Sequence, residues 1–205
     1  MIDMREALAE VSLIRGHLAR GTEFRGYGPT SVAATGVLAA LVALLQSRWI
    51  AGPARPLASY LLMWVGTAAA CVTLVSIEAI ARTRRVHDGL AVHMLHSAVE
   101  QILPPLVAGM LLTVVLLRFA PRELWMLPGL WQVLFSLGVF ASCRFLPRPI
   151  FAVGVWYLAS GMLCLALARG QGTFSPWEMG VPFGVGQLLV AVLLYLGYRN
   201  FREQA

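Results

Sequence analysis

Lysine is absent from this chain, and charged residues of any kind are scarce. All 16 basic residues are arginine, charged side chains make up 13% of the 205 residues, and 59% of the residues are apolar. Soluble domains usually contain about 25% charged residues. The shortage of charge together with the excess of apolar residues excludes an ordinary soluble domain and predicts a membrane protein.

Cysteine is the second scarcity. Cys71, Cys143 and Cys164 are three in number and show no CxxC spacing. An odd count excludes complete disulfide pairing within the chain, and the spacing excludes the usual cysteine-based zinc sites. The three residues lie within or at the ends of apolar stretches. We therefore expect them to be small packing residues.

Soluble catalytic and nucleic-acid-binding motifs are also lacking. The net charge of +6 comes from arginines that are spread over the termini and loops and form no single basic patch. This distribution predicts no nucleic-acid partner. The chain has no Ser/His/Asp set and no nucleotide-binding loop, and the sequence does not identify a cofactor.

Long apolar stretches are what the chain has in abundance. Each stretch is close to the roughly 20 residues that a helix needs to cross a bilayer. Their short connections indicate antiparallel neighbours. We predict an all-α, polytopic membrane protein with six transmembrane helices in one domain, residues 26–205. The predicted spans are Pro29 to Ile50, Ala58 to Ala81, Ile102 to Phe119, Leu124 to Cys143, Ile150 to Ala168 and Pro176 to Tyr198.

Residues 1–25 are predicted to be a separate region. Asp3 and Glu6 have capping-box spacing, and apolar residues recur at helical intervals over residues 3–20. The pattern predicts an N-terminal amphipathic cytoplasmic helix followed by a linker, and the interleaved charges argue against a cleavable signal peptide. The apolar face could pack on the protein, lie on the membrane or dock a protein partner, and these alternatives stay open.

The arginines predict the orientation in the membrane. With six spans both termini lie on one side, which carries eleven of the 16 arginines. The positive-inside rule places that side in the cytoplasm. Exclusive use of arginine, with abundant alanine and glycine, is typical of bacteria, so the predicted location is the bacterial inner membrane. The five arginines on the other side are Arg48, Arg55, Arg118, Arg122 and Arg169.

Several polar side chains are predicted inside or beside the spans. Glu78 lies near the cytoplasmic end of the second span, and Gln132 and Gln187 lie inside the fourth and sixth. Polar residues at such depths can line a transport path. Together with Glu100 these residues are candidates for the polar path of a transporter or channel. Alternatively, Glu100 reaches the interface and the amides bond between helices.

The densest group of reactive side chains precedes the third span. His93, His96 and Glu100 share one face of a predicted interfacial helix. Imidazole and carboxylate groups are ligands for zinc and iron, so these three residues form a candidate metal site. The HExxH spacing is absent, and the alternative is a solvated polar face.

Pro104 and Pro105 predict an interruption after this group. Each proline lacks an amide hydrogen, and its ring displaces the carbonyl four residues earlier. We therefore expect a kink or break between an interfacial helix over residues 88–101 and a shorter span from residue 104 to 119.

The last predicted span carries two further signals. Ser175 and Glu178 have capping-box spacing, which marks where this helix begins. Small residues in the first and last spans predict close contact with neighbouring helices. They are Gly36, Ala40, Gly180 and Gly184.

Two stretches resemble a known family. They are PPLVAGMLLT from Pro104 to Thr113 and MLPGLWQVLFSLGVF from Met126 to Phe140. Both are similar to an uncharacterised family of small bacterial integral membrane proteins with six predicted spans, and the N-terminal segment ending in Thr22, Glu23 and Phe24 fits the same pattern. The resemblance implies the six-span architecture. It carries over no catalytic residue.

These patterns favour a non-enzymatic membrane component: a scaffold, sensor or accessory subunit. It would contact the lipid bilayer, and either a protein partner through residues 3–20 or further copies of itself. Two alternatives stay open. One is a small transporter or channel lined by Glu100, Gln132 and Gln187, and the other is a metal-dependent membrane enzyme that uses His93, His96 and Glu100.

Overall fold

A computed structural model describes residues 28–49, 57–86, 89–143, 148–167 and 175–202. Within these ranges the chain forms six α-helices and two short 3-10 helices, and no strand. The predicted all-α class is confirmed. The α-helices are α2 (Pro29–Trp49), α3 (Leu57–Val86), α4 (Gly89–Phe119), α5 (Leu127–Ser142), α6 (Phe151–Leu167) and α7 (Trp177–Arg202), and the 3-10 helices are η1 (Pro121–Met126) and η2 (Arg148–Ile150). The amphipathic helix predicted for residues 3–20 lies outside the described residues.

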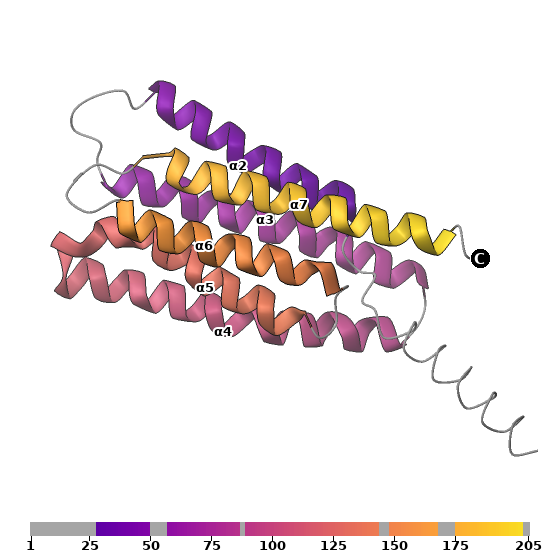
Figure 1. Ribbon diagram of the computed structural model, residues 1–205. Coiled ribbons are helices and arrows are strands. Elements are labelled where there is room, and N and C mark those ends of the chain that lie inside the picture. The colour runs from indigo at the N-terminus through magenta and orange to yellow at the C-terminus, as the bar shows by residue number, and fades with distance from the viewer. Residues whose placement is uncertain (1–27, 50–56, 87–88, 144–147, 168–174, 203–205) are drawn as a thin grey trace, which may run out of the picture.

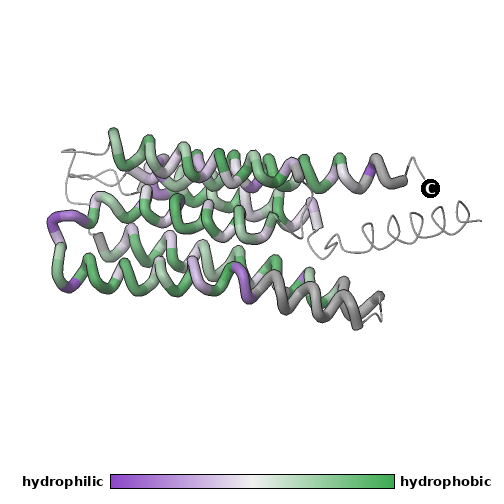
Figure 2. Tube along the Cα trace, turned by 60° about the horizontal axis from the view of Figure 1, so that its bottom comes forward, coloured by the Kyte–Doolittle hydropathy of each residue, from purple (hydrophilic) through white to green (hydrophobic). Residues whose placement is uncertain are grey.

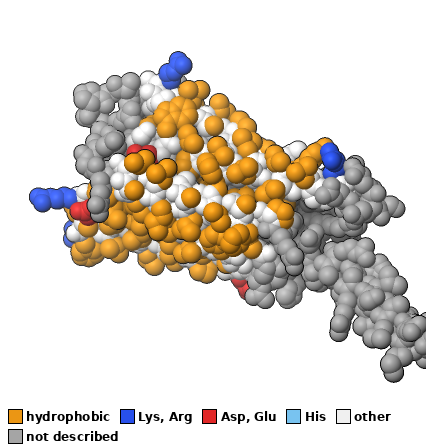
Figure 3. All heavy atoms as spheres, in the orientation of Figure 1, with side chains coloured by type: hydrophobic (Ala, Val, Ile, Leu, Met, Phe, Trp, Pro, Cys, Tyr) orange, Lys and Arg blue, Asp and Glu red, His pale blue; other side chains and the backbone are white. Residues whose placement is uncertain are grey.

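The helices have the length and composition of membrane spans. Five apolar segments of 20 to 24 residues are long enough to cross a bilayer, and α6 is a shorter apolar helix of 17 residues. Hydrophobic residues dominate the helices along their lengths (Figure 2). Apolar side chains cover most of the visible surface, and basic side chains lie toward its ends (Figure 3). Such a surface is suited to hydrocarbon and not to water.

Successive helices run in opposite directions (Figure 1). One end of the bundle, here called the Trp177 end, holds the last residues of α2, α4 and α6 and the first residues of α3, α5 and α7. The opposite end holds the C-terminus. The hairpins α2–α3, α4–α5 and α6–α7 therefore all turn at the Trp177 end.

Glycines allow two pairs of helices to approach closely. The most extensive contacts are between α2 and α7 and between α5 and α6. A Cβ atom on Gly36 of α2 would lie 2.9 Å from the carbonyl oxygen of Gly184 on α7. A Cβ on Gly129 of α5 would lie 2.8 Å from the carbonyl oxygen of Gly161 on α6. The small residues predicted to form close contacts in the first and last spans thus contact each other.

An aromatic cluster fills the space between α5, α6 and α7. Phe135, Tyr157 and Phe183 have ring centroids 4.8 to 5.4 Å apart, in tilted or edge-to-face arrangements that aromatic pairs prefer. Tyr157 is fully buried, and its ring contacts α7 at Gly186, where a side chain would collide with it. The cluster fixes these three helices around the site described below.

Of the predicted kink or break at Pro104 and Pro105, the break is absent, because α4 runs continuously through both residues, and the kink stays a prediction. The prolines remove two amide donors, but a helix in hydrocarbon keeps its other backbone bonds because lipid offers no replacement. The ring of Pro105 also packs where Gly138 of α5 has no side chain. A Cβ on Gly138 would lie 3.1 Å from Pro105 Cγ. Residues 89–101 are therefore part of α4 and not a separate helix.

Candidate functional site

A polar site lies near the Trp177 end, where α5, α6 and α7 meet. Pro182, inside α7, has no amide hydrogen to donate to the carbonyl of Glu178 four residues earlier. The side-chain amide of Gln132 on α5 donates to this carbonyl instead, with an Nε2–O distance of 2.8 Å. Gln132 is fully buried. A side chain of a neighbouring helix thus replaces the donor that the proline lacks.

The same segment of α7 is also held by α6. Trp156 Nε1 donates to the carbonyl oxygen of Pro182 at 3.0 Å. A carbonyl oxygen has two lone pairs, so this bond is compatible with helical bonding of the same group. The proline segment is therefore bound from two sides.

Glu178 lies in the first turn of α7. Its backbone N–H donates to the carbonyl oxygen of Ser175 at 3.1 Å, so α7 begins where the sequence predicted, whereas the side-chain bonds of the capping box stay a prediction. The half-buried carboxyl group is within electrostatic range of the Tyr60 hydroxyl on α3 and the Cys164 thiol on α6. Gln132 Oε1 has no hydrogen-bond partner among the described residues. The site thus combines an acidic group with a buried amide acceptor.

Tryptophan side chains link the helices of all three hairpins that turn at the Trp177 end. Trp64 Nε1 on α3 donates to Gln46 Oε1 on α2 at 3.0 Å, and Gln46 is 2% exposed. Trp131 Nε1 on α5 donates to Thr113 Oγ1 on α4 at 3.0 Å. Trp156 supplies the corresponding bond between α6 and α7. Sequence reasoning missed Gln46 because it lies near the predicted end of a span, where a polar residue is expected to face water.

The four candidates for a polar path lie in different parts of the bundle. Gln132 belongs to the site near the Trp177 end. Glu78, half-buried on α3, lies 21 residues after the start of that helix, which is about 32 Å along its axis. Glu100 is exposed on α4. Glu78 lies 8 residues before the end of α3 and Glu100 lies 11 residues after the start of α4, so the two are at similar depth on antiparallel helices (Figure 1) and far from Gln132.

Gln187, the fourth candidate, lies nine residues beyond Glu178 on α7 and is half-buried. Its Cβ packs near Gly36 of α2. Its side chain is close to the Tyr157 hydroxyl, although the two groups do not have hydrogen-bonding geometry. Gln187 is thus part of the packing between α2, α6 and α7.

The candidate metal ligands all lie on α4. His93, His96 and Glu100 are spaced by three and four residues, so they share a face of this continuous helix. The side chains of both histidines are outside what the structure describes. The described residues contain no group of three His, Cys, Asp or Glu side chains that could hold a metal ion. The metal site remains a prediction.

Six antiparallel apolar helices, with buried polar groups bonded between them, define the class of this chain: it is a polytopic α-helical membrane protein. Comparisons with known protein families, with curated proteins and with solved structures give no match. The resemblance to the six-span bacterial family therefore remains a prediction.

Proposed function

We propose that this protein is a non-enzymatic component of the bacterial inner membrane, with both termini in the cytoplasm, that acts as a scaffold or accessory subunit for another membrane protein. The uneven burial of the helices carries this proposal. The membrane-length segments of α3 and α4 are 11% and 6% buried, compared with 33% to 39% for those of α2, α5 and α7. Two of the longest helices thus offer most of their surface to partners in the membrane.

The exposed surface of α3 supports a helical partner. It includes Gly66, Ala69, Ala70 and Thr73, and no other described helix has an atom within 4 Å of the position of a Cβ on Gly66. Small residues allow close approach between helices in membranes, as they do between α2 and α7. Another helix could approach α3 equally closely at this surface.

The use of the buried polar groups also favours this function over transport. Gln46 and Gln132 both bond neighbouring helices, which is the structural role expected of amides in hydrocarbon. A transporter would instead require loss of flux in Glu100→Gln, measured in vesicles.

The test is to purify the tagged protein from its native membranes in mild detergent and to identify stoichiometric partners by mass spectrometry. Ala70→Phe places a bulky ring on the exposed surface of α3 and should remove the partner. Ala159→Phe is the matched control, because Ala159 is also exposed and lies at mid-length of α6. Retention of a partner in Ala70→Phe would contradict docking on α3, and deletion of residues 3–20 would then test the N-terminal segment. A homo-oligomer without a partner would favour transport.

A further inference from the structure

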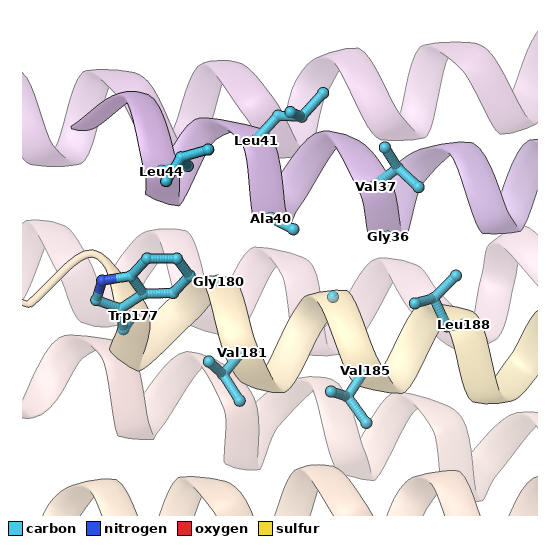
Figure 4. Close-up of a pocket in the computed structure, with 11 residues that line it drawn as sticks. Gly36, Val37, Ala40, Leu41, Leu44, Trp177, Gly180, Val181, Val185 and Leu188 are labelled. Atoms are coloured by element: carbon cyan, nitrogen blue, oxygen red, sulfur yellow. The ribbon is translucent and has the colours of Figure 1, made fainter. Parts of the chain in front are cut away.

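A groove of about 400 Å³ lies between α2 and α7 on the outside of the bundle (Figure 4). Leu41 and Leu44 of α2 and Trp177 and Val181 of α7 stand beside it. None of its lining residues is charged. The groove exists because its floor consists of residues with little or no side chain. They are Gly36, Ala40, Gly180 and Gly184.

The length of the groove matches one leaflet of a bilayer. Its lining on α7 runs from Trp177 to Leu188, which is 11 residues or about 16 Å along the helix axis. The hydrocarbon core of a bilayer is about 30 Å thick, so one leaflet contributes about 15 Å. The groove begins at Trp177, a residue type enriched at membrane interfaces, and ends near mid-membrane.

The groove is too narrow to hold a helix. Even the whole space between the atoms that line the groove, about 810 Å³, gives a mean cross-section of only about 50 Å² when it is divided by this length. A helix 10 Å in diameter has a cross-section of about 80 Å². A single hydrocarbon chain is the membrane component whose shape fits such a groove.

A cationic residue lies beyond the mouth of the groove. Leu41, Leu44 and Arg48 follow one another at spacings of three and four residues, so Arg48 continues the face of α2 that borders the groove. Arg48 is in the last turn of α2 and is exposed. Guanidinium groups bind phosphate through paired N–H donors. The order from mid-membrane outward is therefore an apolar groove, an indole ring and a phosphate-binding charge.

We propose that this groove binds one acyl chain of an anionic glycerophospholipid and that Arg48 binds the phosphate of the same molecule. The acyl chain gains little hydrophobic free energy when it moves from the surrounding lipid into the groove, because lipid tails are as apolar as the groove. Arg48 and the shape of the groove therefore determine the selectivity. The site occupies the leaflet at the Trp177 end.

The experiment uses the full chain in phosphatidylcholine vesicles that contain increasing fractions of phosphatidylglycerol with brominated acyl chains. Bromine quenches nearby indoles, and subtraction of the signal of Trp177→Phe isolates the contribution of Trp177. We expect this contribution to saturate at a low fraction of phosphatidylglycerol. Ala40→Phe fills the groove and should remove the saturable component. Arg48→Gln should weaken the apparent affinity about fivefold.

Two matched variants control for changes elsewhere. Ala34→Phe adds the same ring to an exposed position of α2 that does not line the groove. Arg118→Gln removes an exposed arginine from the last turn of α4, at the same end of the bundle. Neither variant should change how the quenching of Trp177 depends on the fraction of phosphatidylglycerol. If Ala40→Phe does not elute as a folded protein, Val185→Phe fills the groove from the other helix.

Two outcomes would overturn the proposal. One is quenching that rises in proportion to the brominated fraction and is equal in wild type, Ala40→Phe and Arg48→Gln. Such a response would show that Trp177 contacts lipids at random and that the groove binds none of them specifically. The other is a Trp177 that is shielded at every fraction, together with a cross-linked dimer that Ala40→Phe abolishes. That result would assign the groove to a second copy of the chain.

Discussion

The α2–α7 pair and the α3 helix both carry small residues at helical spacing, but they use them differently. In the pair, Gly36 lies so close to Gly184 that a Cβ atom would approach the opposite backbone to 2.9 Å. On α3, no other described helix has an atom within 4 Å of the position of a Cβ on Gly66. Small residues therefore determine how closely a helix can be approached, whereas the arrangement of the other helices decides whether it is approached.

The largest expected effect comes from enlarging one glycine in each region. Gly36→Leu places a side chain against the backbone of α7. Because α7 is also held by α5 and α6, it cannot move away alone, and the substitution should lower the free energy of unfolding by about 3 kcal/mol. Gly66→Leu should leave the unfolding free energy unchanged or raise it by up to about 1 kcal/mol, because leucine is the better helix former. Unfolding in detergent, followed by circular dichroism, measures both. Equal losses in the two variants would show that α3 is packed against another element.

A smaller effect is expected at the proline segment of α7. Gln132→Leu removes the donor to the Glu178 carbonyl and should cost about 1 kcal/mol of unfolding free energy. In a Pro182→Ala background the helix supplies its own donor to that carbonyl, so the same Gln132→Leu change should cost less. The double-mutant cycle on unfolding free energies measures this coupling. Additive losses would mean that the amide does not act by replacing the missing donor.

Effects of equal or smaller size are expected at the tryptophan bonds within hairpins. Trp64→Phe leaves the buried Gln46 oxygen without its donor and should cost about 1 kcal/mol. Trp131→Phe should cost about half of that, because Thr113 is less buried and its hydroxyl keeps its own bond to the Gly109 carbonyl. Hydrogen exchange of α3 and α5 amides, compared with wild type, reports the local loosening. A larger loss in Trp131→Phe would contradict this order.

The sequence was sufficient to predict the class and the approximate bounds of every described helix except the start of α4, because hydrophobic length alone decides whether a segment can cross a bilayer. It also predicted that the first and last spans pack closely. It did not reveal that they pack on each other, because glycines at Gly36 and Gly184 specify a distance of approach and not a partner. Partner choice depends on all six helices at once.

Other features of the site could not be predicted from the sequence either, because they depend on how the helices are arranged. Pro182 predicts a carbonyl without its donor, but only the structure shows that Gln132, fifty residues earlier, supplies one. The two prolines of α4 follow the same rule and led to the wrong expectation of a break. In hydrocarbon a helix tolerates lost donors, since the alternative conformations lose more bonds.

The most extensive contact between the described helices joins the first of them, α2, and the last, α7. During synthesis α2 leaves the ribosome well before α7, so its glycine face meets lipid until the final helix arrives. Long separation along the chain makes such a contact slow to form, and the order of synthesis delays it further. The α2–α7 pair is therefore the closing step of assembly. Until it forms, the lipid groove does not exist.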